Sequence, residues 1–192
     1  QRPEVVVVER GGPDLDRRPA VGRLGIRPLS DLEAGERIIC VDLSTDRLGL
    51  AKGQGATDTW VADENTVERV LEETDGFGAD YTFEATGNVA VMRQAVESAR
   101  MGWGLATVAG VAGKGETLNV IPRFLITGRR IAGSSFGGVK GREGVPKLVD
   151  LYLEGKIDVE PFVSHRIKLD DVNRGFELME AQDGIRSVIE FD

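Results

Sequence analysis

The sequence contains few of the residues that build disulfides and metal sites. Its 192 residues include one cysteine, Cys40, and one histidine, His165. A single cysteine excludes an intrachain disulfide and a cysteine-based zinc cluster, and a lone histidine is more often a structural or surface residue than a ligand. The sequence therefore predicts no metal site in this chain, and we assign no catalytic residue to it.

Long apolar runs and an excess of positive charge are also missing. No apolar run approaches the ~20 residues that a membrane-spanning helix needs, and the opening Gln1-Arg2-Pro3-Glu4 is unlike a secretory signal. The net charge is −8, whereas nucleic-acid binders carry a basic face. We therefore expect a cytoplasmic protein with neither nucleic acid nor membrane as a partner.

What the sequence does contain is a regular alternation of strand and helix patterns. Strands are expected at residues 38–41, 59–62, 79–85 and 105–111, and helices at residues 44–53, 66–74 and 91–99. Val5 to Val8 is typical of a further strand, the first of the sheet. Such alternation predicts an α/β fold, a doubly wound and mostly parallel sheet of the Rossmann type.

Asp42 is the most informative single residue because it directly follows the apolar run at residues 38–41. Ligands of open α/β sheets bind beyond the carboxyl ends of strands, where a carboxylate can accept both ribose hydroxyls of NAD and repel the 2′-phosphate of NADP. The alternative is a helix N-cap or a solvated turn acid. Position alone does not separate these interpretations.

Two glycine-rich segments follow later strands at the same predicted edge. They are Glu84-Ala85-Thr86-Gly87 and Ala109-Gly110-Val111-Ala112-Gly113. The absence of a Cβ lets backbone approach a flat ligand closely, so these segments are candidates for the wall of a cofactor site. The alternative is that the glycines only make tight turns.

Taken together, several motifs resemble the C-terminal part of a zinc-dependent medium-chain alcohol dehydrogenase. They are Arg37-Ile38-Ile39-Cys40-Val41-Asp42, Phe83-Glu84-Ala85-Thr86-Gly87, Ser135-Phe136-Gly137-Gly138 and Gly184-Ile185-Arg186-Ser187-Val188. The most similar branch is class III, the S-(hydroxymethyl)glutathione or formaldehyde dehydrogenases. The resemblance covers about residues 36–192.

The resemblance implies NAD as the cofactor and assigns a set of binding residues. Asp42 and Arg47 would take the adenosine ribose, and Arg186 would take the pyrophosphate through its forked guanidinium. The remaining candidates line the nicotinamide end: the backbones of Ala109, Ser134 and Phe136 for the carboxamide, Gly110 and Val111 for the ring, and Thr86 at the neighbouring turn.

The sequence also departs from the family at two places. The N-terminal lobe that holds zinc in the family has no counterpart here, so this chain carries no zinc ligands and we expect it to be inactive alone. After Val5 to Val8 the family would place G-x-G-x-x-G, but Glu9-Arg10-Gly11-Gly12-Pro13-Asp14 follows. Residues 13–34 lack a helical apolar stripe and contain Pro19 and Pro28.

These departures predict three parts. Residues 1–35 form an atypical segment with one strand followed by irregular chain, residues 36–135 an incomplete NAD-binding domain, and residues 136–192 the C-terminal part of a catalytic domain. We further hypothesise that residues up to about Ala34 are foreign sequence joined to a dehydrogenase.

Three functions stay open. The first is the cofactor-binding part of an NAD-dependent enzyme, a homodimer in the family, that oxidises a primary alcohol or an S-(hydroxymethyl)glutathione-like adduct as its small-molecule substrate. The second is a zinc-free quinone or enoyl reductase, against which Asp42 counts because those enzymes usually prefer NADPH. The third is a non-catalytic nucleotide-binding or interaction fragment.

Overall fold

A computed structural model describes residues 4–9 and 37–191, and the chain divides into two compact units, residues 1–145 and 146–192. The first unit contains a six-stranded sheet in the order β3-β2-β1-β4-β5-β6. Its strands are β1 (Glu4–Glu9), β2 (Arg37–Asp42), β3 (Asp58–Val61), β4 (Tyr81–Glu84), β5 (Leu105–Val108) and β6 (Arg130–Gly133).

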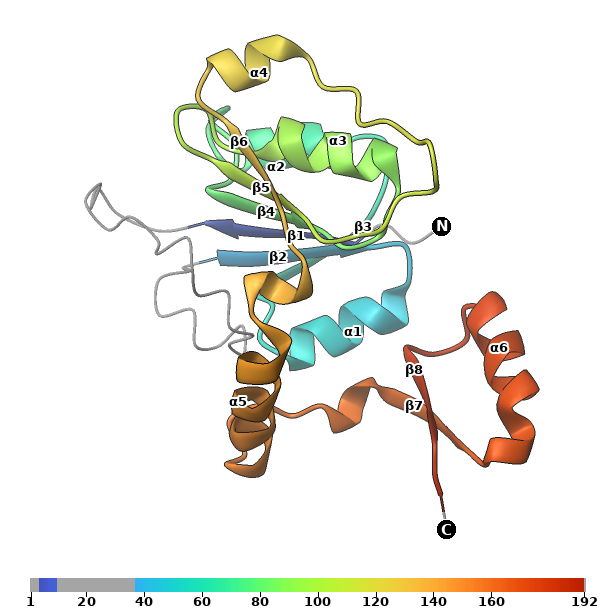
Figure 1. Cartoon of the computed structure of the whole chain (residues 1–192). Helices are drawn as coiled ribbons and strands as arrows, with labels where there is room; N and C mark the ends of the chain where they lie inside the picture. The colour runs from blue at the N-terminus through green and yellow to red at the C-terminus, as the bar shows by residue number, and fades with distance from the viewer. Residues whose placement is uncertain (1–3, 10–36, 192) are drawn as a thin grey trace. The chain divides into compact units, whose positions relative to one another are not determined.

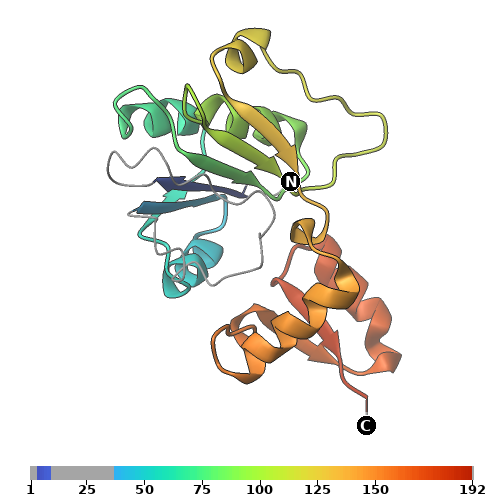
Figure 2. The same cartoon turned by 60° about the vertical axis from the view of Figure 1, so that its left-hand side comes forward.

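Helices cover both faces of this sheet. Helix α1 (Thr45–Gly53) lies on one face, and α2 (Thr66–Glu72) and α3 (Val89–Ser98) lie on the other (Figures 1 and 2). The pairs β2–β3, β4–β5 and β5–β6 are parallel. The expected doubly wound, mostly parallel sheet is therefore confirmed.

The core sits in two layers because successive side chains of a strand point to opposite faces. Ile39 and Val41 of β2 are buried in a cluster with Val70 of α2 and Val91 of α3. Cys40, between them in sequence, packs instead on Leu48 of α1. This double burial explains why β2 is apolar from Ile38 to Val41 rather than alternating with polar residues.

Strand β1 runs in the direction opposite to the one expected. It is antiparallel to both of its neighbours, β2 and β4, with Glu4 opposite Asp42 and Glu9 opposite Arg37. Parallel neighbours require a crossover connection, whereas antiparallel neighbours do not. The segment between these strands lacks a helical stripe in its sequence, which favours the antiparallel arrangement. The predicted irregular course of residues 13–34 lies outside the described residues.

Two elements of the first unit were not expected from sequence. Helix α4 (Pro122–Ile126) has five residues, and β6 follows it at the edge of the sheet. Phe124 of α4 packs against the buried cluster of Val96, Ala99 and Ala106. A short 3₁₀ helix, Phe136–Gly138, and helix α5 (Gly141–Leu153) come next.

The second unit is small. Strands β7 (Val163–Ile167) and β8 (Arg186–Ile189) form a parallel pair, with helix α6 (Val172–Glu180) between them in sequence. Leu178 of α6 is buried.

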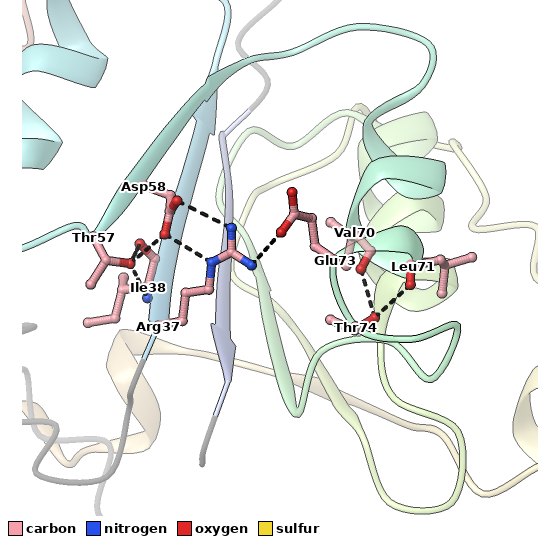
Figure 3. Close-up of polar contacts among 8 residues, drawn as sticks. All are labelled: Arg37, Ile38, Thr57, Asp58, Val70, Leu71, Glu73 and Thr74. Carbon is pink, nitrogen blue, oxygen red and sulfur yellow. Dashed lines mark hydrogen bonds and ion pairs between the residues drawn. The ribbon is translucent and has the colours of Figure 1, made fainter.

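An ion-pair network ties the amino end of β2 to its neighbours (Figure 3). Arg37 donates from Nε and Nη2 to the two carboxylate oxygens of Asp58, at 3.0 and 3.3 Å, and from Nη1 to Glu73 at 2.8 Å. These hydrogen bonds raise the pKa of Arg37, and the bond from Arg37 is the main reason that the pKa of Asp58 is lowered. The network therefore stabilises the edge of the sheet where β2 and β3 begin.

Candidate functional site

The candidate site is the carboxyl edge of the sheet, meaning the residues at and just after the ends of β2, β4, β5 and β6. These strands end at Asp42, Glu84, Val108 and Gly133. The parallel register sets Glu84 beside Val108 and Val108 beside Gly133. Since β1 separates β2 from β4, Asp42 and Glu84 lie two strand spacings apart, roughly 10 Å. The edge therefore presents an acidic end and a glycine-rich end.

At the acidic end, Asp42 is buried, with 5% of its surface exposed. Its Oδ1 accepts a hydrogen bond from the backbone N–H of Ser44 at 2.7 Å and lies 3.8 Å from Nη1 of Arg47. Ser44, and not Asp42, is the N-cap of α1, because the Ser44 hydroxyl accepts from the N–H of Arg47. The N-cap alternative for Asp42 is therefore wrong. Both of these contacts involve Oδ1 and neither involves Oδ2.

At the glycine-rich end, Glu84 is the residue that sequence reasoning overlooked. It is completely buried. Its Oε1 accepts three hydrogen bonds: from the Thr86 N–H at 2.6 Å, the Thr86 hydroxyl at 2.6 Å and the Gly87 N–H at 2.8 Å. Its Oε2 has no hydrogen-bond partner in the described part of the chain. The available signal was an acidic residue at the last position of a strand expected from the sequence.

The turns after β4 and β5 are in direct backbone contact. An ideal Cβ built on Gly110 would lie 2.1 Å from the Gly87 nitrogen and 2.8 Å from Oε2 of Glu84. An ideal Cβ on Gly87, whose φ is +80°, would lie 2.2 Å from the carbonyl oxygen of Val111. Glycine is therefore needed at both positions because another backbone segment lies too close for a Cβ, and not only because the chain turns there.

The other candidates at this end hold the edge together through their backbone. The N–H groups of Ala109 and Gly110 donate to the carbonyl oxygen of Glu84 at 2.7 and 3.1 Å, and the N–H of Ser134 donates to that of Val108 at 2.9 Å. Val111 is 91% exposed, the most exposed of the large apolar side chains in the described residues. An apolar surface of this kind suits the face of a planar ligand.

Two candidates stand apart from this description. Phe136 begins the 3₁₀ helix that follows β6, and only its backbone is described. Arg186 belongs to the second unit, where it opens β8 and its Nη1 donates to the carbonyl oxygen of Ile185 at 2.8 Å. The proposed roles of both residues stay predictions.

The sequence matches the family model described as zinc-binding dehydrogenase over residues 20–154. That match covers well over half of the chain. The chain belongs to the zinc-binding dehydrogenase family.

Individual relatives agree with this assignment. The chain is 46% identical over 156 residues to alcohol dehydrogenase class-3 of Myxine glutinosa, covering 80% of this chain and 42% of the relative. It is 43% identical over 174 residues to S-(hydroxymethyl)glutathione dehydrogenase of Haemophilus influenzae, covering 90% and 46%. The chain therefore spans about half the length of these relatives.

Solved structures of the family have the same fold. The benzyl alcohol dehydrogenase of Acinetobacter calcoaceticus matches with a TM-score of 0.75 and 27% identity, covering 83% of this chain and 44% of that one. An alcohol dehydrogenase of Thermus sp. ATN1 matches with a TM-score of 0.72 and 25% identity, covering 83% and 45%. The resemblance to a zinc-type alcohol dehydrogenase is therefore confirmed.

The family match corrects the hypothesis about the N-terminal segment. It begins at residue 20, so the family pattern extends further toward the N-terminus than a junction near Ala34 allows. The hypothesis that all residues up to Ala34 are foreign is therefore wrong for residues 20–34.

The family uses NAD and zinc, and the described residues differ in how well they suit each. In residues 4–9 and 37–191, no group of three or more His, Cys, Asp and Glu side chains could hold a metal ion. No helix in the same residues is long and apolar enough to cross a membrane. For NAD, a buried carboxylate and a glycine-lined turn pair stand at the carboxyl edge, where dinucleotides bind in such sheets.

The direction of β1 bears on the pyrophosphate. In the family's fold type the phosphate-binding loop follows the first strand at the carboxyl edge. Here β1 ends at Glu9, opposite Arg37, at the amino edge of its neighbours. The carboxyl end of β1 therefore lies at the sheet edge opposite to the proposed cofactor site.

Proposed function

We propose that this chain is the cofactor-binding part of an NAD-dependent, zinc-type alcohol dehydrogenase. In the whole enzyme the substrate would be a primary alcohol or an S-(hydroxymethyl)glutathione-like adduct. The observation that carries the proposal is the buried Asp42 carboxylate at the end of a parallel strand, on the same sheet edge as the Gly87–Gly110 contact. The sequence relatives named above support the substrate class.

Asp42 is the residue that selects the cofactor in this proposal. Its Oδ2 accepts hydrogen bonds from the adenosine ribose hydroxyls, while Oδ1 stays bound to the Ser44 N–H. Arg47, 3.8 Å from Oδ1, keeps the carboxylate oriented. A 2′-phosphate in the same place would meet a buried negative charge, so the site favours NAD over NADP.

The glycine-rich end holds the nicotinamide. The N–H groups of Ala109 and Ser134 are already used within the protein, so their carbonyl oxygens are the groups that accept the carboxamide N–H. Val111 covers one face of the ring, and the lack of a Cβ at Gly110 lets the backbone approach it.

The oxidation itself requires zinc, which acts as a Lewis acid on the alcohol oxygen and favours its deprotonation. We propose that residues outside the described chain supply the zinc and the substrate contacts, and that this chain alone orients the cofactor without transferring hydride.

A calorimetric titration with NADH tests this function, with NADPH as the parallel ligand. We expect saturable NADH binding and weaker NADPH binding. Asp42→Ala should weaken NADH binding about tenfold or more, because hydrogen bonds to a charged group contribute ~1.5–3 kcal/mol. Asp46→Ala is the matched control, since Asp46 is an exposed carboxylate in the first turn of helix α1, which follows Asp42 in the chain.

No heat of binding at millimolar NADH would contradict the proposal. NADH and NADPH binding with equal affinity, unchanged by Asp42→Ala, would contradict the role of Asp42.

The reversed β1 favours a second candidate, a non-catalytic nucleotide-binding fragment. The carboxyl end of β1 lies at the amino edge of its neighbours, away from the edge where the pyrophosphate would bind. Selectivity for NADH over NADPH separates the two, because only the cofactor-binding part of a dehydrogenase needs it. NADH selectivity that Asp42→Ala abolishes would support the first candidate, whereas nucleotide binding without that selectivity would support the fragment. Dehydrogenase activity of the purified chain would contradict both.

We also propose that the whole enzyme is a homodimer that pairs through the edge strand β6. Strand β6 is the last strand of the sheet, so it pairs with β5 on one side and with no described strand of this sheet on the other. Light scattering after size-exclusion chromatography tests the proposal, and a monomer at high micromolar concentration would contradict it.

A further inference from the structure

Glu84 is a buried ionisable residue at the end of β4. It is 0% exposed, and its Oε2 has no hydrogen-bond partner among the residues that the structure describes. An unsatisfied buried oxygen costs free energy, and in native structures such groups mark strain or function. A smaller or apolar residue at this strand end would avoid the cost.

We propose that Glu84 is a positioning residue for the nicotinamide end of the bound cofactor. The inference rests on the proposed function, because it assigns a role within that site. Glu84 is too deeply buried to touch the ligand, and it acts through the two turns that would touch it.

The Glu84 carboxylate holds the turn after β4 in place. Three donors converge on Oε1 of Glu84, and two of them belong to Thr86. The third comes from the N–H of Gly87. Charge-assisted hydrogen bonds of 2.6 to 2.8 Å are among the strong ones. The carboxylate therefore fixes where the Thr86–Gly87 backbone lies.

The position of the turn after β4 determines the position of the turn after β5, because the two turns are in contact. A Cβ on Gly110 would meet the Gly87 backbone and Oε2 of Glu84, and a Cβ on Gly87 would meet the Val111 backbone, so neither position has room for one. The carbonyl oxygen of Glu84 also accepts from the N–H groups of Ala109 and Gly110. A shift of the first turn must therefore displace the backbone that carries Ala109 and Val111.

The adenosine end of the bound cofactor should not depend on Glu84. Asp42 lies on β2, roughly 10 Å away across β1, and its partners Ser44 and Arg47 belong to the start of α1. Removing the Glu84 carboxylate should therefore disturb the nicotinamide end and spare the adenosine end.

The test compares two probes on the full chain, NADH and ADP, of which only NADH carries nicotinamide. For Glu84→Ala we expect NADH affinity to fall about tenfold or more and ADP affinity to stay within about twofold. The shift of NADH fluorescence on binding should be lost as well. Glu84→Gln should restore NADH binding, because its amide oxygen can accept the same three hydrogen bonds. Glu72→Ala, which removes an exposed carboxylate of α2, is the control.

Several outcomes would overturn the proposal. Equal losses of NADH and ADP affinity would mean that Glu84 only supports the fold, and unchanged NADH affinity would mean that it positions nothing. If Glu84→Ala does not fold, Glu84→Asp decides the question, since it keeps the charge but shortens the reach; an unchanged NADH-to-ADP affinity ratio would then reject the role.

The proposed function fails in a distinguishable way. If the unmodified chain binds neither NADH nor ADP, the site itself is absent and the role of Glu84 falls with it. If it binds both, and Glu84→Ala leaves the Thr86 and Gly87 amide protons as protected from exchange as before, only the inference about Glu84 is overturned.

Discussion

Gly87 and Gly110 lie so close together that an ideal Cβ on Gly110 would stand 2.1 Å from the Gly87 nitrogen. One residue follows β4 and the other follows β5, so the contact joins the ends of two neighbouring parallel strands. At this contact the two turns meet backbone to backbone, beside the buried carboxylate of Glu84. Glycine is required at position 110 by the Gly87 backbone and at position 87 by the Val111 backbone.

Gly110→Ala is therefore expected to destabilise the fold and weaken NADH binding together. The added methyl would overlap backbone atoms, which cannot move aside as a flexible side chain can. We expect a loss of about 1–3 kcal/mol in unfolding free energy, as for other overpacked sites, measured by urea denaturation. Gly49→Ala is the control, because its Cβ would meet nothing within 4 Å, and an alanine inside helix α1 should stabilise it. A neutral Gly110→Ala would contradict the contact.

The pairing of Asp58 with Arg37 predicts a pH dependence of stability. The hydrogen bond from Arg37 lowers the pKa of Asp58 in the folded state. The stabilisation is therefore fully present above the unfolded pKa of about 3.9 and is lost as the pH falls through the lower folded pKa. The pair is partly exposed, so the effect should be modest, about 1 kcal/mol or less.

Asp58→Asn checks this prediction against the background of the other carboxylates. Urea denaturation of both proteins between about pH 5 and pH 2 should give a shallower acid decline for the variant than for the unmodified chain. Parallel curves would show that Asp58 contributes nothing to the pH dependence.

Val111→Ala should separate binding from stability. Val111 is 91% exposed, so its truncation should leave the unfolding free energy within about 0.5 kcal/mol. If the side chain covers the nicotinamide ring, NADH affinity should fall while ADP affinity stays constant. Ile39→Ala is the opposite case, because Ile39 is fully buried and its truncation should cost about 2–5 kcal/mol. Equal destabilisation by the two variants would contradict these burial assignments.

The direction of β1 can be measured directly by NMR. Antiparallel pairing sets Val5 beside Val41 and Glu84, and Val8 beside Ile38 and Tyr81. We expect backbone nuclear Overhauser contacts between these partners. Contacts of Val5 with Ile38 instead would indicate a parallel strand, and with it a sheet whose first strand ends at the carboxyl edge.

Much of the secondary structure of the first unit was predictable, because most of its helices and strands have a recognisable pattern of apolar residues in the local sequence. Strand β2 is a short β-branched run closed by an acid, and α3 places its apolar residues at helical spacing. Strand β6 was not predictable from its pattern, since it is four residues long and mostly exposed at a sheet edge. Helix α4, at five residues, is too short to show a period.

The sequence by itself determined the α/β alternation, the family and the position of Asp42 at a strand end, because periodicity and motif order are properties of neighbouring residues. Only the tertiary structure decided the reversed pairing of β1, the complete burial of Glu84 and the contact between Gly87 and Gly110. Each of these depends on which distant segments lie side by side. Local pattern carries no information about strand direction, and a glycine in a turn looks the same whether or not another backbone packs against it.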